Sequence, residues 1–265
     1  MKGLIFYFSG TGTTKLAVEY IAANLCNIEF DFHDMNDKNV PDLRKYDLLG
    51  FASYAQAFNP PQYVEDFIKK LNRAENKYAF IFSTYGLING NTLNKIGNWV
   101  ERIGCRVIAG FALHTPESSP IMIRYKITSE NSPNEKEMKK FNNFIKALDL
   151  KVNGIKLGTI IEEININENR ILGLMGEILR GSSFASIGKK YVDTDKCIKC
   201  KVCQEKCPYN AIQFQDEYPK FDEKKCKSCF ICYNKCSVQA ISSNKYKTIR
   251  YNKPNDKIFN QLNVK

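Results

Sequence analysis

The chain has 265 residues, 43% of them apolar, which is enough for a packed core and for more than one domain. No stretch approaches the roughly 20 apolar residues of a membrane helix, and no signal peptide is recognisable, so we expect a cytoplasmic protein without a membrane partner. The net charge of +11 suits an acidic protein partner. Because the lysines are scattered and accompany no nucleic-acid-binding motif, we do not expect a nucleic acid partner.

The first 150 residues alternate between apolar strand patterns and amphipathic helix patterns. The expected strands cover residues 2–8, 28–32, 47–53, 78–83 and 105–113. The expected helices follow residue 14 and cover residues 60–71, 91–103 and 134–150. This alternation is typical of a parallel sheet covered by helices on both faces, in which ligands bind beyond the carboxyl ends of the strands.

A loop rich in glycine and hydroxyl groups follows the first expected strand, at residues 9–14. Glycines let the backbone approach a ligand, hydroxyls donate hydrogen bonds, and a helix N-terminus supplies free N–H groups, so the loop suits a phosphate. It has neither the lysine of a nucleoside triphosphate loop nor the glycine spacing of a dinucleotide fingerprint. Composition alone leaves a second interpretation open, namely a hydroxyl-rich turn that binds nothing.

The pattern Ser9-x-Thr11-Gly12-x-Thr14 resembles the phosphate loop of flavodoxins, and the order of elements through residue 150 resembles the flavodoxin fold. The resemblance implies an α/β protein with a doubly wound, five-stranded parallel sheet and FMN as cofactor. It places the FMN phosphate on Ser9, Gly10, Thr11, Gly12, Thr13 and Thr14. It places the flavin ring beside Ser53, Tyr54, Phe58, Asn59, Thr84, Tyr85 and Gly86. The segment 52–59 lacks the glycine that flavodoxins usually carry there.

A few residues outside the loop have two interpretations. Ordinary core packing is the alternative to flavin stacking for each aromatic side chain, and we expect Trp99 to be core. Cys26 and Cys105 are expected to be small buried side chains. His114 follows the fifth strand on the ligand side, where a flavin contact is the alternative to a structural role.

Residues 151–190 form a segment between the two halves of the chain, with an apolar helix pattern over residues 165–180 and Gly181 as its stop. Such a helix is too apolar to be a free tether. We expect it to pack between two domains or against a second copy of the chain in a homodimer.

The cysteine spacing of residues 191–245 is the most specific motif of the chain. Two runs with the spacing Cys-x2-Cys-x2-Cys-x3-Cys are offset by 29 residues, and this spacing is typical of bacterial two-cluster ferredoxins. In this spacing the fourth cysteine of a run ligates the cluster of the other run. One 4Fe-4S cluster is therefore predicted on Cys197, Cys200, Cys203 and Cys236. The other is predicted on Cys226, Cys229, Cys232 and Cys207.

Zinc is the competing metal, since Cys-x2-Cys pairs also bind it, but the doubled run favours clusters. Residues 191–245 are then a small α+β ferredoxin-like domain, and 246–265 a basic tail that lies mostly on the surface.

The two halves together resemble the flavodoxin–ferredoxin fusion proteins of anaerobic bacteria and archaea. The resemblance implies an electron-transfer protein that relays electrons between FMN, two 4Fe-4S clusters and external redox proteins. One alternative is an iron-sulfur flavoprotein oxidoreductase that reduces a small acceptor or uses NAD(P)H, although the nicotinamide fingerprint is missing. Another is a subunit of a larger redox complex. No acid–base or nucleophilic group of residues is visible, so no catalytic residue is assigned.

Overall fold

The computed structural model describes residues 1–167, 171–178, 188–245, 250–251 and 254–263. Its N-terminal domain is built on a five-stranded sheet with the order β2-β1-β3-β4-β5, in which all neighbours are parallel. The strands are β1 (Lys2–Tyr7), β2 (Glu29–Asp34), β3 (Leu48–Tyr54), β4 (Tyr78–Tyr85) and β5 (Arg106–His114). This strand order defines the flavodoxin-like doubly wound fold, so the predicted fold class is confirmed.

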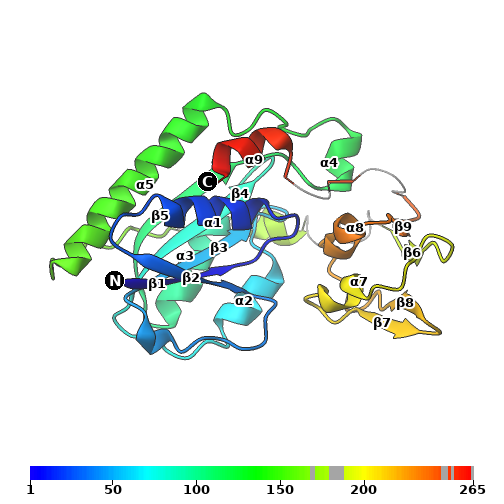
Figure 1. Ribbon diagram of the computed structural model, residues 1–265, viewed down its shortest axis with the longest axis horizontal. Coiled ribbons are helices and arrows are strands. Elements are labelled where there is room, and N and C mark those ends of the chain that lie inside the picture. Colours follow the sequence, from blue (N-terminus) through cyan, green and yellow to red (C-terminus); the bar gives the residue numbers. More distant parts are fainter. Residues whose placement is uncertain (168–170, 179–187, 246–249, 252–253, 264–265) are drawn as a thin grey trace.

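Helices cover both faces of the sheet (Figure 1). One face packs against α1 (Thr13–Ala23), α5 (Glu135–Lys156) and α9 (Asp256–Leu262). The other packs against α2 (Gln62–Ile68) and α3 (Thr92–Arg102). Because both faces are covered, β1, β3 and β4 are continuous apolar runs, which is why the sequence predicted them well. Trp99 lies in this core, as expected, and is only 7% exposed.

The helices differ from the prediction mainly at the end of α5 and by one additional short helix. Helix α5 continues to Lys156, beyond the expected end at residue 150, and begins with a capping box between Asn134 and Glu137. As the sequence indicated, the crossover from β2 to β3 has no α-helix, and it contains only the 3₁₀ turn η1 (Leu43–Lys45). A short helix, α4 (Pro120–Arg124), was not expected. Cys105 is buried as expected, whereas the prediction for Cys26 is wrong, because Cys26 is exposed at the end of α1.

After α5 the chain returns along the edge strand β5, where the Ile164 N–H donates to the Val107 carbonyl at 2.9 Å. Of the helix expected over residues 165–180, residues 171–178 are helical, while 168–170, 179–180 and the expected stop at Gly181 lie outside the described residues. This helix contacts the loop after β3 through Asn59, whose Nδ2 donates to the Gly173 carbonyl at 3.3 Å.

The C-terminal domain is small and has both helices and strands, as predicted. Two antiparallel pairs, β6–β9 and β7–β8, flank two short helices (Figure 1). The elements are β6 (Lys190–Val192), α7 (Val202–Glu205), β7 (Ile212–Gln215), β8 (Tyr218–Phe221), α8 (Ile231–Lys235) and β9 (Ile241–Ser243).

The end of the chain differs from the surface tail that the sequence predicted. Helix α9 returns to the N-terminal domain and buries Ile258 and Leu262 completely beside α1. These two residues lie four apart, so they share one face of the helix. The Asn255 side chain caps the helix by accepting from the Ile258 N–H at 2.9 Å.

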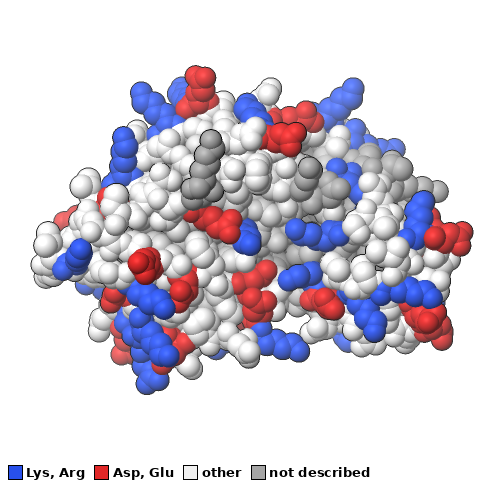
Figure 2. All heavy atoms as spheres, in the orientation of Figure 1, with Lys and Arg blue, Asp and Glu red and all other residues white. Residues whose placement is uncertain are grey.

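No helix in the described part of the chain is both long and apolar enough to span a membrane. On the face shown in Figure 2, lysine and arginine side chains are spread over both domains, with carboxylates among them.

Candidate cofactor sites

A pocket lies at the carboxyl ends of the parallel strands, where the fold rule expects a ligand. Loops after β1, β3, β4 and β5 contribute to its wall, and so does the C-terminal domain. Its lining residues are Gly10, Thr11, Thr13, Thr14, Tyr54, Ala55, Thr84, Tyr85, Gly86, Thr115, Pro116, Glu117, Ser118, Cys229, Ile231 and Asn234.

The expected phosphate loop forms one side of this pocket. Ser9 and Gly12 hold its shape, since the Ser9 hydroxyl accepts from the Gly12 N–H at 3.2 Å and from the Lys15 N–H at 3.4 Å. Gly12 has a φ of 106°, which a residue with a side chain rarely adopts. Helix α1 begins directly after it, so its positive dipole end and free N–H groups lie at the pocket.

The loop after β4 forms the opposite side. The Thr84 and Thr14 hydroxyls are 2.8 Å apart, which ties the two loops together. Tyr85 lines the pocket and stacks on the His114 ring, with centroids 5.1 Å apart and an angle of 14°. His114 does not line the pocket: its Nε2 is 2.6 Å from the Gly86 carbonyl and its Nδ1 is 2.8 Å from a Glu137 carboxylate oxygen. It therefore positions the Gly86 backbone.

Tyr54 is the aromatic side chain that joins the pocket to the C-terminal domain. Its ring stacks on Phe8 at 5.5 Å, and its hydroxyl is buried without a hydrogen-bond partner among the described residues. Burial, together with the nearby Cys229, raises the pKa of Tyr54 well above its ordinary value. A buried hydroxyl without a partner is costly, so this group is available to a polar ligand atom.

Three of the predicted flavin contacts do not line the pocket. Ser53 is fully buried within β3, and Asn59 faces the helix at residues 171–178. The Phe58 carbonyl accepts from the Asn91 N–H at 2.8 Å. The chain turns at Ala57 and Phe58, both with a positive φ, and this turn carries Phe58 and Asn59 away from the pocket. Two non-glycine residues thus make the turn for which flavodoxins usually use glycine.

The sequence prediction missed two parts of the pocket wall. Thr115 to Ser118 follow β5, whose carboxyl end was expected at the ligand side but was given no site residue. Cys229, Ile231 and Asn234 come from the other domain, and no sequence signal indicated which part of that domain contacts the pocket.

A second cavity lies inside the C-terminal domain, and Cys207, Cys226, Cys229 and Cys232 line it. They are one of the two predicted ligand sets, and we call them the inner set. Burial raises the pKa of the Cys229 thiol to about 12 and that of Cys232 well above its ordinary value. Four soft thiol donors around one buried cavity fit the ligand set of a 4Fe-4S cluster, whose iron stabilises the thiolate form.

The second predicted set, Cys197, Cys200, Cys203 and Cys236, lies nearer the surface, and we call it the outer set. Cys200 is exposed, whereas Cys203 is half-buried. Burial, together with the neighbouring Cys200 and Cys236, raises the pKa of Cys203 to about 11. Cys236 of the second run thus lies beside the first run.

The fourth cysteine of each run has the same backbone contact. The Cys207 sulfur accepts from the Ala211 N–H at 3.3 Å, and the Cys236 sulfur accepts from the Ala240 N–H at 3.2 Å. The inner set has an additional donor, the ammonium of Lys190, at 3.0 Å from the Cys226 sulfur. Burial lowers the pKa of Lys190, but Cys226 and other neighbouring groups outweigh it, so the pKa is raised and the side chain stays charged.

The domains meet where the pocket and the inner set adjoin. Ile231 of α8 is 4% exposed and belongs to the apolar core on the α2 and α3 side of the sheet. Nearby, the rings of Tyr63 and Tyr209 meet edge to face at 5.9 Å. Cys229 lines both the pocket and the cavity of the inner set.

Comparison with known proteins agrees with the cysteine geometry. Residues 190–213 match the 4Fe-4S binding domain family. A ferredoxin from Alicyclobacillus acidocaldarius subsp. acidocaldarius is 50% identical over 34 residues, which are 13% of this chain. The match spans 42% of the length of that ferredoxin. The C-terminal domain is a 4Fe-4S ferredoxin domain.

Solved flavodoxins resemble the N-terminal part. One from the domain Archaea is 17% identical, with a TM-score of 0.44, over 58% of this chain and 99% of the flavodoxin. The two-electron reduced Megasphaera elsdenii flavodoxin is 25% identical, with a TM-score of 0.37, over 42% and 84% of the respective chains. The fold assignment rests on the strand order rather than on these values. The chain combines a flavodoxin-like domain with a ferredoxin domain, and this combination indicates an electron-transfer role.

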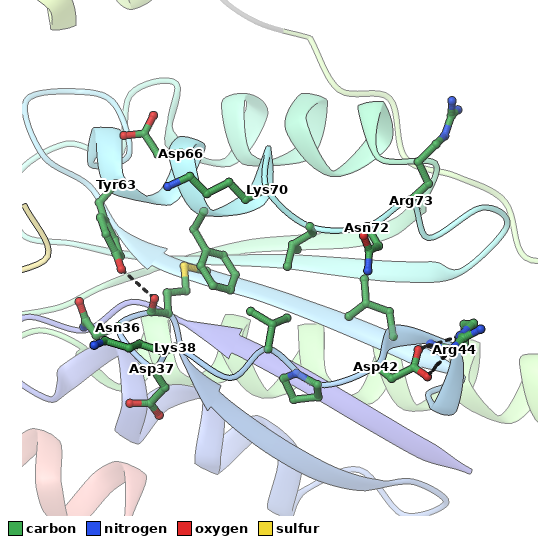
Figure 3. Close-up of a pocket in the computed structure, with 16 residues that line it drawn as sticks. Asn36, Asp37, Lys38, Asp42, Arg44, Tyr63, Asp66, Lys70, Asn72 and Arg73 are labelled. Carbon is green, nitrogen blue, oxygen red and sulfur yellow. Dashed lines mark hydrogen bonds and ion pairs between the residues drawn. The ribbon is translucent and has the colours of Figure 1, made fainter.

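The largest cavity described, about 890 Å³, lies elsewhere (Figure 3). It opens between the helix-free crossover after β2 and the segment that includes α2, with Tyr63 near one end and Arg73 near the other. Charges of both signs surround an apolar floor that includes Phe67. It contains none of the predicted site residues, and the missing crossover helix accounts for it.

Proposed function

We propose that the chain relays electrons between FMN in the strand-end pocket and two 4Fe-4S clusters held by the inner and outer sets. The observation that carries the proposal is the double role of Cys229, which lines the pocket and also the cavity of the inner set. A cluster held by the inner set would touch the wall of the flavin site without an intervening helix or strand.

The residues of the pocket fit FMN. The loop around Gly10 and Thr11, at the start of α1, offers N–H and hydroxyl donors to the phosphate. Tyr54 and Tyr85 offer flat side chains on the two loops that would flank the ring. Bound FMN supplies the chemistry that couples a two-electron partner to one-electron carriers. The protein's part is to hold the ring beside Cys229 and to exclude water from that contact.

The two sets differ in exposure, and this difference gives the relay an order. The inner set adjoins the pocket, whereas the outer set includes the exposed Cys200. External redox proteins would therefore exchange electrons at the outer set. Ile198 in its first run is 61% exposed, and the net charge of the chain is +11, a combination that suits an acidic partner with an apolar spot. The neighbouring Lys196 and Lys199 pair with Asp193 and Glu217.

The test is anaerobic reconstitution followed by rapid mixing with a reduced acidic ferredoxin. We expect one FMN and eight iron atoms per chain, and bleaching of the flavin after electrons arrive. Removal of the outer cluster by Cys200→Ala should abolish reduction of FMN by the protein donor, yet leave its reduction by a small chemical reductant intact. Undiminished reduction by the protein donor would contradict the relay, and zinc without sulfide would contradict both clusters.

A further inference from the structure

Lys190 is an unusual neighbour for a cluster ligand. Its side chain belongs to β6, is only 7% exposed, and lines the cavity of the inner set. The ammonium lies 3.0 Å from the Cys226 sulfur, within reach of a charge-assisted hydrogen bond. The exposed Glu223 accepts from the Lys190 backbone N–H at 3.2 Å.

The internal repeat supplies the comparison. The position 29 residues after Lys190 is Pro219, a buried residue of β8 that pairs with Phe214 in the β7–β8 sheet. Proline has no charge and no hydrogen to donate. At the position equivalent to Lys190, the repeat therefore offers the outer set no buried ammonium.

Lys199 and Arg250 also interact electrostatically with cysteines of the two sets, and neither reproduces this difference. Lys199 is close enough to Cys197 to interact with it, but it is exposed and pairs with Glu217. Arg250 lies near Cys232 and Cys236, one cysteine of each set, so its field acts on both. Only Lys190, among these three cations, is buried and directed at a single set.

We infer that Lys190 raises the reduction potential of the inner cluster above that of the outer cluster, a conclusion that rests on the relay proposed above. An added electron makes a cluster more negative, so a fixed positive charge and a hydrogen bond to a ligand sulfur favour the reduced form. The effect is large where water is excluded. One electron lost by the outer site is gained by the inner site, and no bond breaks. Electrons that enter at the exposed end therefore collect beside the flavin pocket.

The inference predicts two separate cluster potentials in a redox titration followed by electron paramagnetic resonance. In Lys190→Met, the higher of the two potentials should fall by at least about 59 mV. For one electron this is a tenfold change in the equilibrium constant for electron transfer between the clusters. Lys190→Arg should keep the wild-type separation. Lys189→Met removes the same charge from the exposed neighbouring residue and should change neither potential by more than a small fraction of that shift.

The wild-type protein gives an independent result if Lys190→Met loses its clusters. The cluster that survives in Cys200→Ala is the inner one, and its potential should match the higher of the two wild-type values. Two results would overturn the inference without contradicting the relay. One is equal potentials in a wild-type protein that contains eight iron atoms. The other is a surviving cluster in Cys200→Ala whose potential matches the lower wild-type value. Too few iron atoms in the wild-type protein would instead contradict the relay itself.

Discussion

The two cysteine runs have the same backbone and different surroundings. Three pairs of positive-φ residues recur at the repeat distance of 29: Lys199 (58°) with Ser228 (53°), Lys201 (61°) with Phe230 (59°), and Asn210 (49°) with Gln239 (54°). The backbone turns between and after the cysteines therefore have nearly the same conformation in both runs. Cluster binding, which depends on those turns, is expected to be alike in both copies.

The side chains between the cysteines differ. Phe230 is 6% exposed and Tyr233 1%, whereas their counterparts Lys201 and Gln204 are exposed. Phe230 and Tyr233 belong to the ferredoxin domain's own core, whereas Ile231, which lies between them in sequence, packs into the core of the flavodoxin-like domain. A repeat thus fixes the cluster sites, and a few substitutions within it decide which site adjoins the flavin pocket.

The largest effect is expected from iron removal, which tests whether the two domains depend on metal to the same extent. Among the described residues, the ferredoxin domain's own core cluster has only five buried members, whereas the sheet of the flavodoxin-like domain has a large core on each face. We expect a chelator to unfold residues 190–243 and to leave β1, β3 and β4 intact. Hydrogen exchange measures this, and amides of β7 and β8 that stay protected without iron would contradict it.

The next effect is loss of one cluster, and it tests the exchange of ligands between the runs. Cys207→Ala should remove the cluster of the second run, although Cys207 belongs to the first, and Cys236→Ala should do the reverse. Each variant should retain four iron atoms. Hydrogen exchange should increase around Cys229 in the first variant and around Cys200 in the second. Increased exchange within the mutated run alone would show that each run binds its own cluster.

A smaller effect is expected at the domain contact, where the repeat offers a matched control. Ile231→Ala should reduce the free energy of unfolding by about 3 kcal/mol, because Ile231 is buried in the core of the flavodoxin-like domain. It should also weaken FMN binding roughly tenfold, about 1.4 kcal/mol, because Ile231 lines the pocket.

Val202 is the counterpart of Ile231 in the first run and is only half-buried. Val202→Ala should cost less than about 1 kcal/mol and should leave FMN affinity unchanged. Denaturant unfolding and flavin fluorescence titration measure both quantities. Equal FMN affinities in the two variants would show that the second run does not form the pocket wall.

Much of the fold and part of the pocket were predictable from sequence. Strands β1, β3 and β4 are buried on both faces and are therefore continuous apolar runs, and the glycine-rich loop lies directly before a helix. The cysteine spacing by itself predicts which cysteines ligate each cluster. The positions of Phe58 and Asn59 were not predictable, because the turn at Ala57 depends on packing against later segments.

The docking of the domains was not predictable either. Ile231 and Val202 are both apolar residues at the same place in the repeat, and only tertiary packing distinguishes them. Helix α9 was missed because Ile258 and Leu262 stand in a polar, lysine-rich tail, and their four-residue spacing gains meaning only beside the apolar face of α1.

The smallest effect concerns the strained position that both runs share. Lys201 and Phe230 adopt left-handed backbone conformations, which cost a residue with a side chain roughly 1–2 kcal/mol. Lys201→Gly should relieve that strain at an exposed site and stabilise the loaded protein by about 0.5–1 kcal/mol, after allowance for the greater freedom of glycine in the unfolded chain.

Phe230→Gly relieves the same strain but removes a buried ring, so it should destabilise the protein by about 3 kcal/mol. Denaturant midpoints under anaerobic conditions give both values. Opposite signs at these two positions would show that the two runs share the same strained backbone, while the side chain of Phe230 stabilises the core of the ferredoxin domain. The same sign at both would mean that burial of Phe230 contributes nothing to the core of the ferredoxin domain.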